Sequence, residues 1–221
     1  MKTAIVIGAT GLVGKELTQL LLNDSRIEKV KLFVRRSTGI THAKLEEHVA
    51  DFNNPDAWKK WVSGDILYSA MGTTLKAAGS KEAQYLVDHT YQLNMAKTAA
   101  ANGVQKYILV SAGGASAQSK IFYSRMKGEL ELDIRKLPFE TIHILRPGML
   151  KGHRDNTRTG EIIGGAVLDL VSRLPGLKAL QPITGHEVAK AMINASFRHI
   201  VGIHSYSPGA LFKLSELVPV V

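Results

Sequence analysis

The sequence predicts an α/β fold in which a parallel sheet is covered by helices on both faces. Three observations support this prediction. Short apolar runs alternate with helical patterns, the loops between them are short, and the first apolar run turns directly into a helix. Right-handed crossovers between successive strands would make the sheet doubly wound.

Six apolar runs are the expected strands of this sheet. They occupy Thr3–Ile7, Lys29–Val34, Glu47–Asp51, Ile66–Ala70, Lys106–Ser111 and Thr141–Leu145. The expected helices occupy Leu12–Leu22, Trp58–Val62, Lys81–Asn102, Tyr123–Leu137 and Glu161–Arg173. Beyond Leu150 the alternation loosens, although His186–Phe197 is typical of a short helix and Ile203–Tyr206 of a short strand. We expect one domain over residues 1–221, in which 151–221 form a small C-terminal appendage on the substrate side.

The composition excludes several classes of protein. With 221 residues, 45% of them apolar, the chain can bury a sizeable core. No stretch reaches the roughly 20 apolar residues that span a bilayer, and the N-terminus resembles a strand rather than a targeting leader. The chain has no cysteine, which excludes disulfides and thiolate catalysis. We therefore expect a cytoplasmic protein that does not associate with membranes.

The net charge of +9 is compatible with two kinds of partner. A basic protein can bind nucleic acid, or it can attract a small anionic cofactor and substrate. No basic run is longer than two residues, and few aromatic side chains are interleaved with them for base stacking. We expect a small-molecule substrate and no nucleic acid. We predict no metal site, and the sequence leaves the oligomeric state open, with a homodimer as one alternative.

A glycine loop follows the first expected strand. Gly8, Gly11 and Gly14 recur at three-residue spacing between that strand and the next helix. Gly8 would permit the tight turn, Gly11 the close approach of a pyrophosphate, and Gly14 the packing of helix on strand. Because backbone N–H groups at a helix N-terminus bind phosphate, the loop predicts a dinucleotide site of the Rossmann type.

Arginines follow the second expected strand. About 20 residues after the glycine loop, an NAD enzyme places an acid on the ribose 2′-hydroxyl. This chain has Arg35 and Arg36 there instead, and a guanidinium is suited to phosphate. We therefore predict NADP(H) rather than NAD, against the alternative of two surface arginines.

Small and polar residues follow the third and fourth strands. Asp51 is placed to accept a hydrogen bond from an adenine amino group, or to start the turn that contains Asn53. Gly72 and Thr73 would let the ribose and pyrophosphate approach the backbone closely. An ordinary loop is the alternative.

A possible catalytic pair follows the fifth strand. Tyr123 and Lys127 lie one turn apart on one face of the expected helix. A phenol titrates near pH 10 in isolation, and a nearby ammonium brings the phenolate into working range. Ser111, at the end of the strand, is a candidate to hold a carbonyl oxygen.

After the sixth strand, Arg146 and Arg154 are candidates to bind an acidic substrate group, and the alternative for Arg146 is a pair with a neighbouring carboxylate.

These motifs together resemble the short-chain dehydrogenase/reductase family in its extended or atypical form, nearest to the Tat-interacting-protein-like branch. The resemblance covers most of the chain. It implies a Tyr123 proton donor and a Lys127 that binds the nicotinamide ribose and lowers the tyrosine pKa. It also implies a set of cofactor-binding residues: Gly8, Thr10, Gly11, Leu12, Val13, Gly14, Arg35, Arg36, Asp51, Phe52, Gly72, Thr73, Pro147 and Gly148.

Two positions depart from the family pattern. The family commonly carries paired serines after the fifth strand, the second of them catalytic, whereas this chain has Ser111 followed by Ala112. Ser116 and Ser119 are the possible substitutes. The asparagine of the family's proton relay has no clear match, although Asp88 and Asn94 lie in the corresponding helix.

The expected function is an NADP(H)-dependent oxidoreductase that reduces a small carbonyl substrate by hydride transfer. Two alternatives stay open. The Ser111 departure favours a sensor that binds NADPH without catalysis. A nucleotide-sugar epimerase is common among extended members, but such enzymes carry a larger C-terminal domain and tend to hold NAD.

Overall fold

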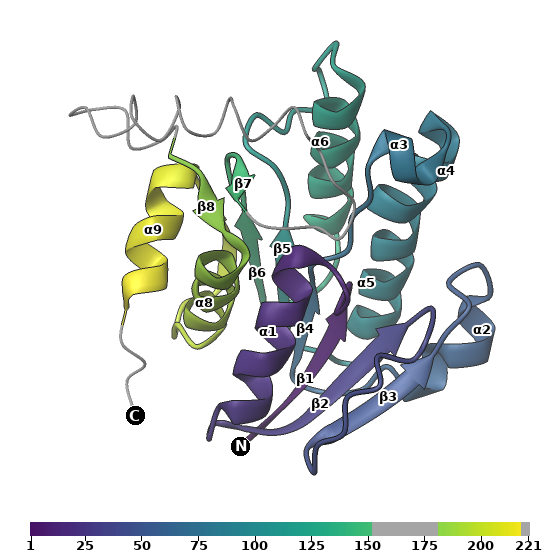
Figure 1. Ribbon diagram of the computed structural model, residues 1–221, viewed down its shortest axis with the longest axis vertical. Coiled ribbons are helices and arrows are strands. Elements are labelled where there is room, and N and C mark those ends of the chain that lie inside the picture. Colours follow the sequence, from purple (N-terminus) through teal and green to yellow (C-terminus); the bar gives the residue numbers. More distant parts are fainter. Residues whose placement is uncertain (152–180, 218–221) are drawn as a thin grey trace.

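Seven parallel strands form one sheet at the centre of the molecule (Figure 1). This computed structural model describes residues 1–151 and 181–217. The strand order is β3-β2-β1-β4-β5-β6-β9. The strands are β1 (Lys2–Ile7), β2 (Ile27–Val34), β3 (Leu45–Val49), β4 (Ile66–Ser69), β5 (Lys106–Val110), β6 (Thr141–Leu145) and β9 (Gly202–Tyr206). The predicted doubly wound sheet is confirmed, and its order reverses between β1 and β4.

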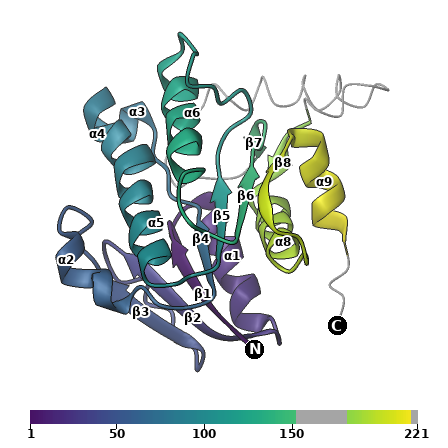
Figure 2. The same cartoon turned by 180° about the vertical axis from the view of Figure 1, so that it is seen from behind.

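Helices cover both faces of this sheet (Figures 1 and 2). One face carries α1 (Leu12–Asn23), α8 (Gly185–Ser196) and α9 (Pro208–Glu216). The other carries α2 (Pro55–Trp58), α5 (Tyr91–Ala101) and α6 (Phe122–Ile134). The short helices α3 (Leu75–Ala78) and α4 (Lys81–Tyr85) connect β4 to α5, and a separate ribbon pairs β7 (Leu150–Lys151) with β8 (Ile183–Thr184).

The central strand β1 shows why both faces need cover. Ala4 and Val6 belong to the apolar cluster under α1 and α8, whereas Ile5 and Ile7 belong to the cluster under α5 and α6. All four are fully buried. Because successive side chains of a strand point to opposite faces, an unbroken apolar run requires helices on both sides.

The described part of the C-terminal region is built into the main sheet. Strand β9 pairs with β6, and α8 packs against α1. A Cβ on Gly185, the first residue of α8, would lie 2.5 Å from the carbonyl oxygen of Leu12. Thr184 and Glu187 form a capping box that fixes the start of this helix. The beginning of α8 is therefore held beside the beginning of α1.

Most predicted elements are found, with several differences. The predicted helix Lys81–Asn102 is divided by a π-helical segment, η2 (Leu86–Thr90). The predicted helix Trp58–Val62 is replaced by α2 and a 3₁₀ turn, because a proline at the first helical position starts α2 earlier. Helices α3 and α9 were not predicted, and the predicted helix Glu161–Arg173 lies outside the described residues.

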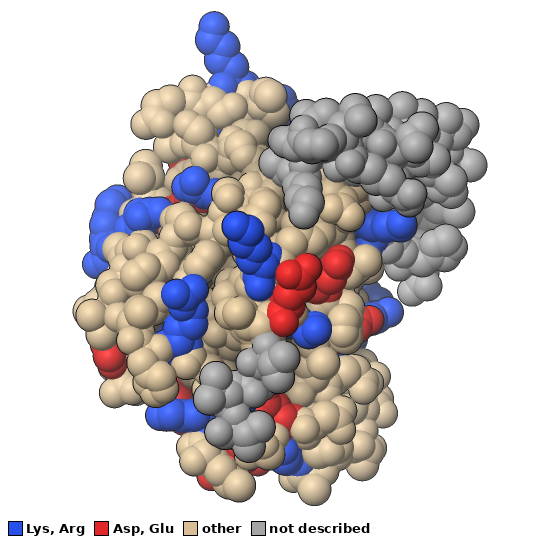
Figure 3. All heavy atoms as spheres, turned by 90° about the vertical axis from the view of Figure 1, so that its left-hand side faces the viewer, with Lys and Arg blue, Asp and Glu red and all other residues tan. Residues whose placement is uncertain are grey.

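Basic side chains are scattered over the face that carries α9, α8 and α1 (Figure 3). Away from the grey atoms, they stand among neutral and acidic residues and do not form one continuous patch on that face. None of the helices in the two described ranges combines the length and apolarity that a bilayer crossing requires.

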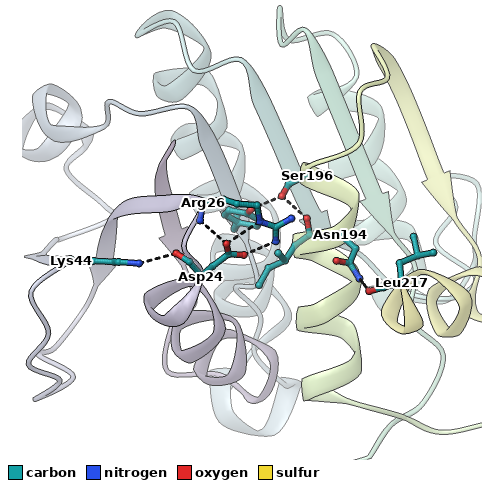
Figure 4. A network of polar contacts seen from close by, with 8 residues as sticks. Asp24, Arg26, Lys44, Asn194, Ser196 and Leu217 are labelled. Carbon is teal, nitrogen blue, oxygen red and sulfur yellow. Dashed lines mark hydrogen bonds and ion pairs between the residues drawn. The ribbon is translucent and has the colours of Figure 1, made fainter. Parts of the chain in front are cut away.

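A polar network ties α1 to α8 at the amino ends of the strands (Figure 4). The carboxylate of Asp24 accepts hydrogen bonds from Arg26 Nε at 2.9 Å and Nη2 at 2.6 Å. The Arg26 guanidinium also stacks 3.8 Å above the ring centre of Phe197. Lys44 donates to the Asp24 carbonyl at 2.8 Å. Burial alone would raise the pKa of the Asp24 carboxyl, but the bonds and charge of Arg26 hold it below its ordinary value.

Replacing Asp24 by Asn is expected to lower the free energy of unfolding at pH 7 by about 1.5–3 kcal/mol, the range for hydrogen bonds to charged groups. The folded-state pKa of Asp24 is depressed. Its contribution is therefore present above the ordinary carboxyl pKa of about 3.9 and is lost as pH falls through the folded value. Urea unfolding at pH 7 and pH 3 measures both effects. The exposed Asp56 is the control: Asp56→Asn should leave stability unchanged, and a difference between Asp24→Asn and wild type that is as large at pH 3 as at pH 7 would contradict the prediction.

Candidate cofactor and catalytic site

The glycine loop requires glycine at two positions for different reasons. Gly8 has φ +83°, and a Cβ there would lie 2.4 Å from the amide nitrogen of Met71. A Cβ on Gly14 would lie 2.0 Å from the carbonyl oxygen of Gly8. Gly8 therefore permits both the turn and the close passage of the β4 loop, and Gly14 permits the contact of α1 with the end of β1.

The N-terminus of α1 is suited to an anion. Its N-cap is Gly11, which provides no side-chain cap, and the first turn holds no acidic residue. Thr10 and Gly11 are exposed and Leu12 is half-buried, so the loop is accessible, whereas Val13 is buried and offers only its backbone N–H. The first-turn N–H groups and the positive end of the helix dipole are the groups that bind phosphate at such helices.

Arg35 and Arg36 lie exposed directly after β2. Among the described residues, no carboxylate forms a pair with either guanidinium. The acid that reaches this loop is Glu47 of β3, and it binds the backbone N–H and hydroxyl of Thr38 instead. The loop therefore presents two cations to solvent.

The residues predicted to flank adenine have separate environments. Asp51 is exposed and its Oδ1 accepts from the backbone N–H of Asn53 at 2.9 Å, which is the turn interpretation. The Phe52 side chain is 2% exposed and packs against Trp58 and Tyr91. Phe52 thus belongs to the core, and its side chain is not accessible to a cofactor.

The loop after β4 leads to a buried ion pair that the sequence did not reveal. The backbone N–H of Thr73 donates to Asp88 Oδ2 at 2.8 Å, and Lys127 Nζ lies 3.0 Å from Asp88 Oδ1. The side chains of Asp88 and Lys127 are 1% and 3% exposed. Gly72 lies beside this carboxylate, because a Cβ there would be 3.2 Å from Asp88 Oδ1. The predicted loop residues and the predicted lysine are therefore joined through Asp88.

Ser111 and Arg146 share a different carboxylate. Ser111 is buried and its Oγ donates to Glu131 Oε1 at 2.5 Å. Arg146 Nε donates to the same oxygen at 2.9 Å, and its Nη2 bonds the other one. The bond to Glu131 raises the pKa of the Arg146 guanidinium. This network occupies the serine hydroxyl, and the carboxylate alternative for Arg146 is the one observed.

Tyr123 is the accessible member of the predicted pair. It is 41% exposed in the first turn of α6, whereas Lys127 is buried one turn later. The loop after β5 lies against this helix, because a Cβ on Gly128 would be 2.2 Å from the amide nitrogen of Ala117. In that loop, the Ser116 hydroxyl donates to Gln118 and the Ser119 hydroxyl accepts from a backbone N–H.

The last predicted contacts follow β6. Pro147 is buried and its carbonyl accepts from the backbone N–H of Gly113 at 2.7 Å, which joins the loops after β5 and β6. Gly148 is half-buried. Arg154, the second candidate for an acidic substrate group, lies outside the described residues.

Known proteins resemble this chain over most of its length. A family model described as NAD(P)H-binding matches residues 8–197. The protein fmp52, mitochondrial, of Aspergillus niger is 33% identical over 211 residues, which cover 91% of this chain and 90% of that protein. FMP52, mitochondrial, of Eremothecium gossypii is 35% identical over 187 residues, which cover 84% and 82% of the two chains.

Solved structures share the fold. UDP-N-acetylglucosamine 4-epimerase of Methanobrevibacter ruminantium M1 superposes with a TM-score of 0.70 at 16% identity, over 97% of this chain and 80% of that one. A short-chain dehydrogenase/reductase superfamily protein of Agrobacterium tumefaciens, solved with bound NAD, gives 0.67 at 16% identity over 93% and 77% of the two chains.

The expected cytoplasmic location is contradicted by the relatives. The proteins that match nine-tenths of this chain are named as mitochondrial. The absence of cysteine excludes disulfides, but it does not distinguish one reducing compartment from another, and this is why the expectation was wrong.

Proposed function

Because this chain belongs to the NAD(P)H-binding family, with the fold of short-chain dehydrogenases/reductases, we propose that it is an NADP(H)-dependent oxidoreductase that reduces a small carbonyl compound. One observation carries the proposal: the exposed Tyr123 precedes the buried Lys127 by one turn of α6, the helix that follows β5. The carboxyl ends of parallel strands meet at one edge of the sheet, so this pair shares an edge with the glycine loop.

The residues of this edge fit a dinucleotide. The N–H groups of Gly11, Leu12 and Val13 would bind the pyrophosphate at the uncapped start of α1. Arg35 and Arg36 would bind a 2′-phosphate. Bound NADPH supplies the hydride.

Tyr123 and Lys127 would manage the proton. The Tyr123 hydroxyl donates a hydrogen bond to the carbonyl oxygen and transfers its proton as negative charge develops there. The Lys127 ammonium favours the phenolate that this transfer leaves. Among the described residues Asp88 takes one of the three N–H donors of Lys127, which leaves donors for ribose hydroxyls.

The preference for NADPH over NADH is expected to depend on the two exposed arginines. Arg35→Ala and Arg36→Ala should each raise the Kd for NADPH by about tenfold or more, because each removes a charge-assisted bond to phosphate. The Kd for NADH should change by less than about twofold, since NADH lacks that phosphate. Isothermal titration with both cofactors measures the difference.

The exposed Lys213 on α9 provides the matched control. Lys213→Ala also removes one positive charge, but far from the β2 loop in sequence and on a different element. It should leave both Kd values unchanged. Equal losses of NADPH and NADH affinity in the arginine variants would show that Arg35 and Arg36 do not bind the 2′-phosphate.

A sensor that binds NADPH without catalysis is the second candidate, and Ser111 favours it. The serine hydroxyl that would hold a carbonyl oxygen is buried and donates to Glu131. A sensor should bind NADPH yet reduce no member of a broad panel of aldehydes and ketones, whereas NADPH oxidation with any of them would exclude this candidate.

A further inference from the structure

We propose that Asp88 is the positioning residue of the Tyr123–Lys127 pair, holding the Lys127 ammonium in place and offsetting its charge one helical turn from Tyr123. This inference rests on the proposed oxidoreductase function, because it assigns Tyr123 and Lys127 to the reaction. It goes further by assigning a role to a carboxylate on another helix and by predicting the effect of its charge on the phenol.

The geometry around the Asp88 carboxylate leaves it little freedom. One oxygen lies 3.0 Å from Lys127 Nζ and the other accepts from the Thr73 N–H at 2.8 Å. Both charged side chains are almost fully buried. A buried charge without a partner is strongly destabilising, so neither group can leave the other at low energetic cost. Asp88 therefore fixes Lys127 relative to the loop after β4.

The backbone of Asp88 is held as firmly as its side chain. Asp88 lies in the π-helical segment η2, and such segments are frequent at functional sites. Its carbonyl oxygen accepts from Gln92 Nε2 at 2.7 Å, and Gln92 Oε1 accepts from the Ser69 hydroxyl at 2.7 Å. Ser69 and Gln92 are fully buried. The carboxylate is thus positioned from the end of β4 as well as from its own helix.

The other charged groups near this pair have different partners. On η2, His89 is bound to Asp133; on α6, Glu131 is bound to Arg146 and Ser111. On α4, Lys81 lies over the ring of Phe122 and Tyr85 stacks on His89. Within the described residues, Asp88 is the carboxylate in contact with the Lys127 ammonium.

A carboxylate on the ammonium changes what the ammonium does to the phenol. Alone, a buried positive charge would stabilise the Tyr123 phenolate strongly. With Asp88 in contact, part of this stabilisation is offset. The protonated phenol is the form that donates a proton to a carbonyl. Alcohol oxidation would instead need the phenolate as base.

Asp88→Asn tests this offset without requiring turnover. The amide keeps an oxygen that accepts from Thr73 but loses the charge. The phenolate of Tyr123 is followed by ultraviolet absorbance as pH is raised, and the Tyr123→Phe chain subtracts the other tyrosines. We expect the pH midpoint of the Tyr123 signal to fall by about one unit in Asp88→Asn. If carbonyl reduction is found, its decline at alkaline pH should move to lower pH by the same amount.

Asp133→Asn is the control, since it removes one negative charge from the same region without touching Lys127. It should leave the midpoint in place. If Asp88→Asn does not fold, Gly72→Ala replaces it, because the added Cβ would crowd Asp88 Oδ1 and loosen the pair. The midpoint should then fall as well, by less. An unchanged or raised midpoint in either folded variant overturns the inference, whereas a lowered midpoint without carbonyl turnover overturns only the proposed function.

Discussion

Replacing Tyr123 by phenylalanine is expected to lower kcat for carbonyl reduction by about 10²- to 10⁴-fold, the usual contribution of a positioned acid. The hydroxyl is the proton donor of the proposed reaction, and phenylalanine keeps the ring that occupies the first turn of α6. The Kd for NADPH should stay within about twofold, because the phosphate groups are bound at the other elements. Stopped-flow oxidation of NADPH and a binding titration measure the two quantities.

The phenol of Tyr85 provides the matched control for this variant. Tyr85 lies on α4 and stacks on His89, 4.5 Å between ring centres, so Tyr85→Phe removes a hydroxyl from a neighbouring helix. It should leave kcat unchanged. If Tyr123→Phe reduces carbonyls as fast as the wild type, Tyr123 is not the proton donor, and if both tyrosine variants lose activity equally, the loss reflects general damage.

The parts of the site that follow from local backbone demands could be predicted from the sequence. Gly8 was assigned to a tight turn and Gly14 to a contact between helix and strand. In the structure Gly8 has a positive φ, and a Cβ on Gly14 would lie 2.0 Å from a backbone oxygen. The strand Thr141–Leu145 was predicted to the residue, because a fully buried strand is a short apolar run between polar segments.

The parts that depend on long-range partners could not be predicted. The pair of Asp88 and Lys127 joins two elements far apart in the sequence, and Asp88 lies in a π-helical segment that no periodic pattern predicts. Ser111 follows its strand as expected, yet its hydroxyl is taken by Glu131, a residue of α6 that carries no motif. Phe52 follows its strand too, but packs into the core because Trp58 and Tyr91 lie beside it. For Lys127, Ser111 and Phe52, the place along the chain could be read from the sequence, but the side chain that each one contacts could not.

A signal for one missed element was present. Helix α9 begins at Pro208 after Ser207, and proline at the first helical position is a recognised start signal. Helix α3 is a single turn capped by Thr74, and a segment this short carries too few residues to show a helical period.

The largest effect on stability is expected at Gly8. Gly8→Ala should lower the free energy of unfolding by about 3–5 kcal/mol, because it combines left-handed backbone strain with overlap against the backbone of the β4 loop. A domain of this kind is stable by about 5–15 kcal/mol, so the variant should be near its folding limit. Urea denaturation at neutral pH measures the change.

Gly79 separates the two causes, because it shares the positive φ of Gly8 and lacks the overlap. Gly79 has φ +87° and a Cβ there would meet nothing within 4 Å, whereas the Cβ of Gly8→Ala would lie 2.5 Å from the carbonyl oxygen of Ala70. Gly79→Ala should therefore lose only about 1–2 kcal/mol, the cost of the left-handed conformation itself. The excess loss in Gly8→Ala measures how tightly the glycine loop is pressed against the loop after β4. Equal losses of stability in the two variants would mean that the loop after β4 moves away from the added Cβ at little energetic cost. Glycine would then be needed at position 8 only for its positive φ.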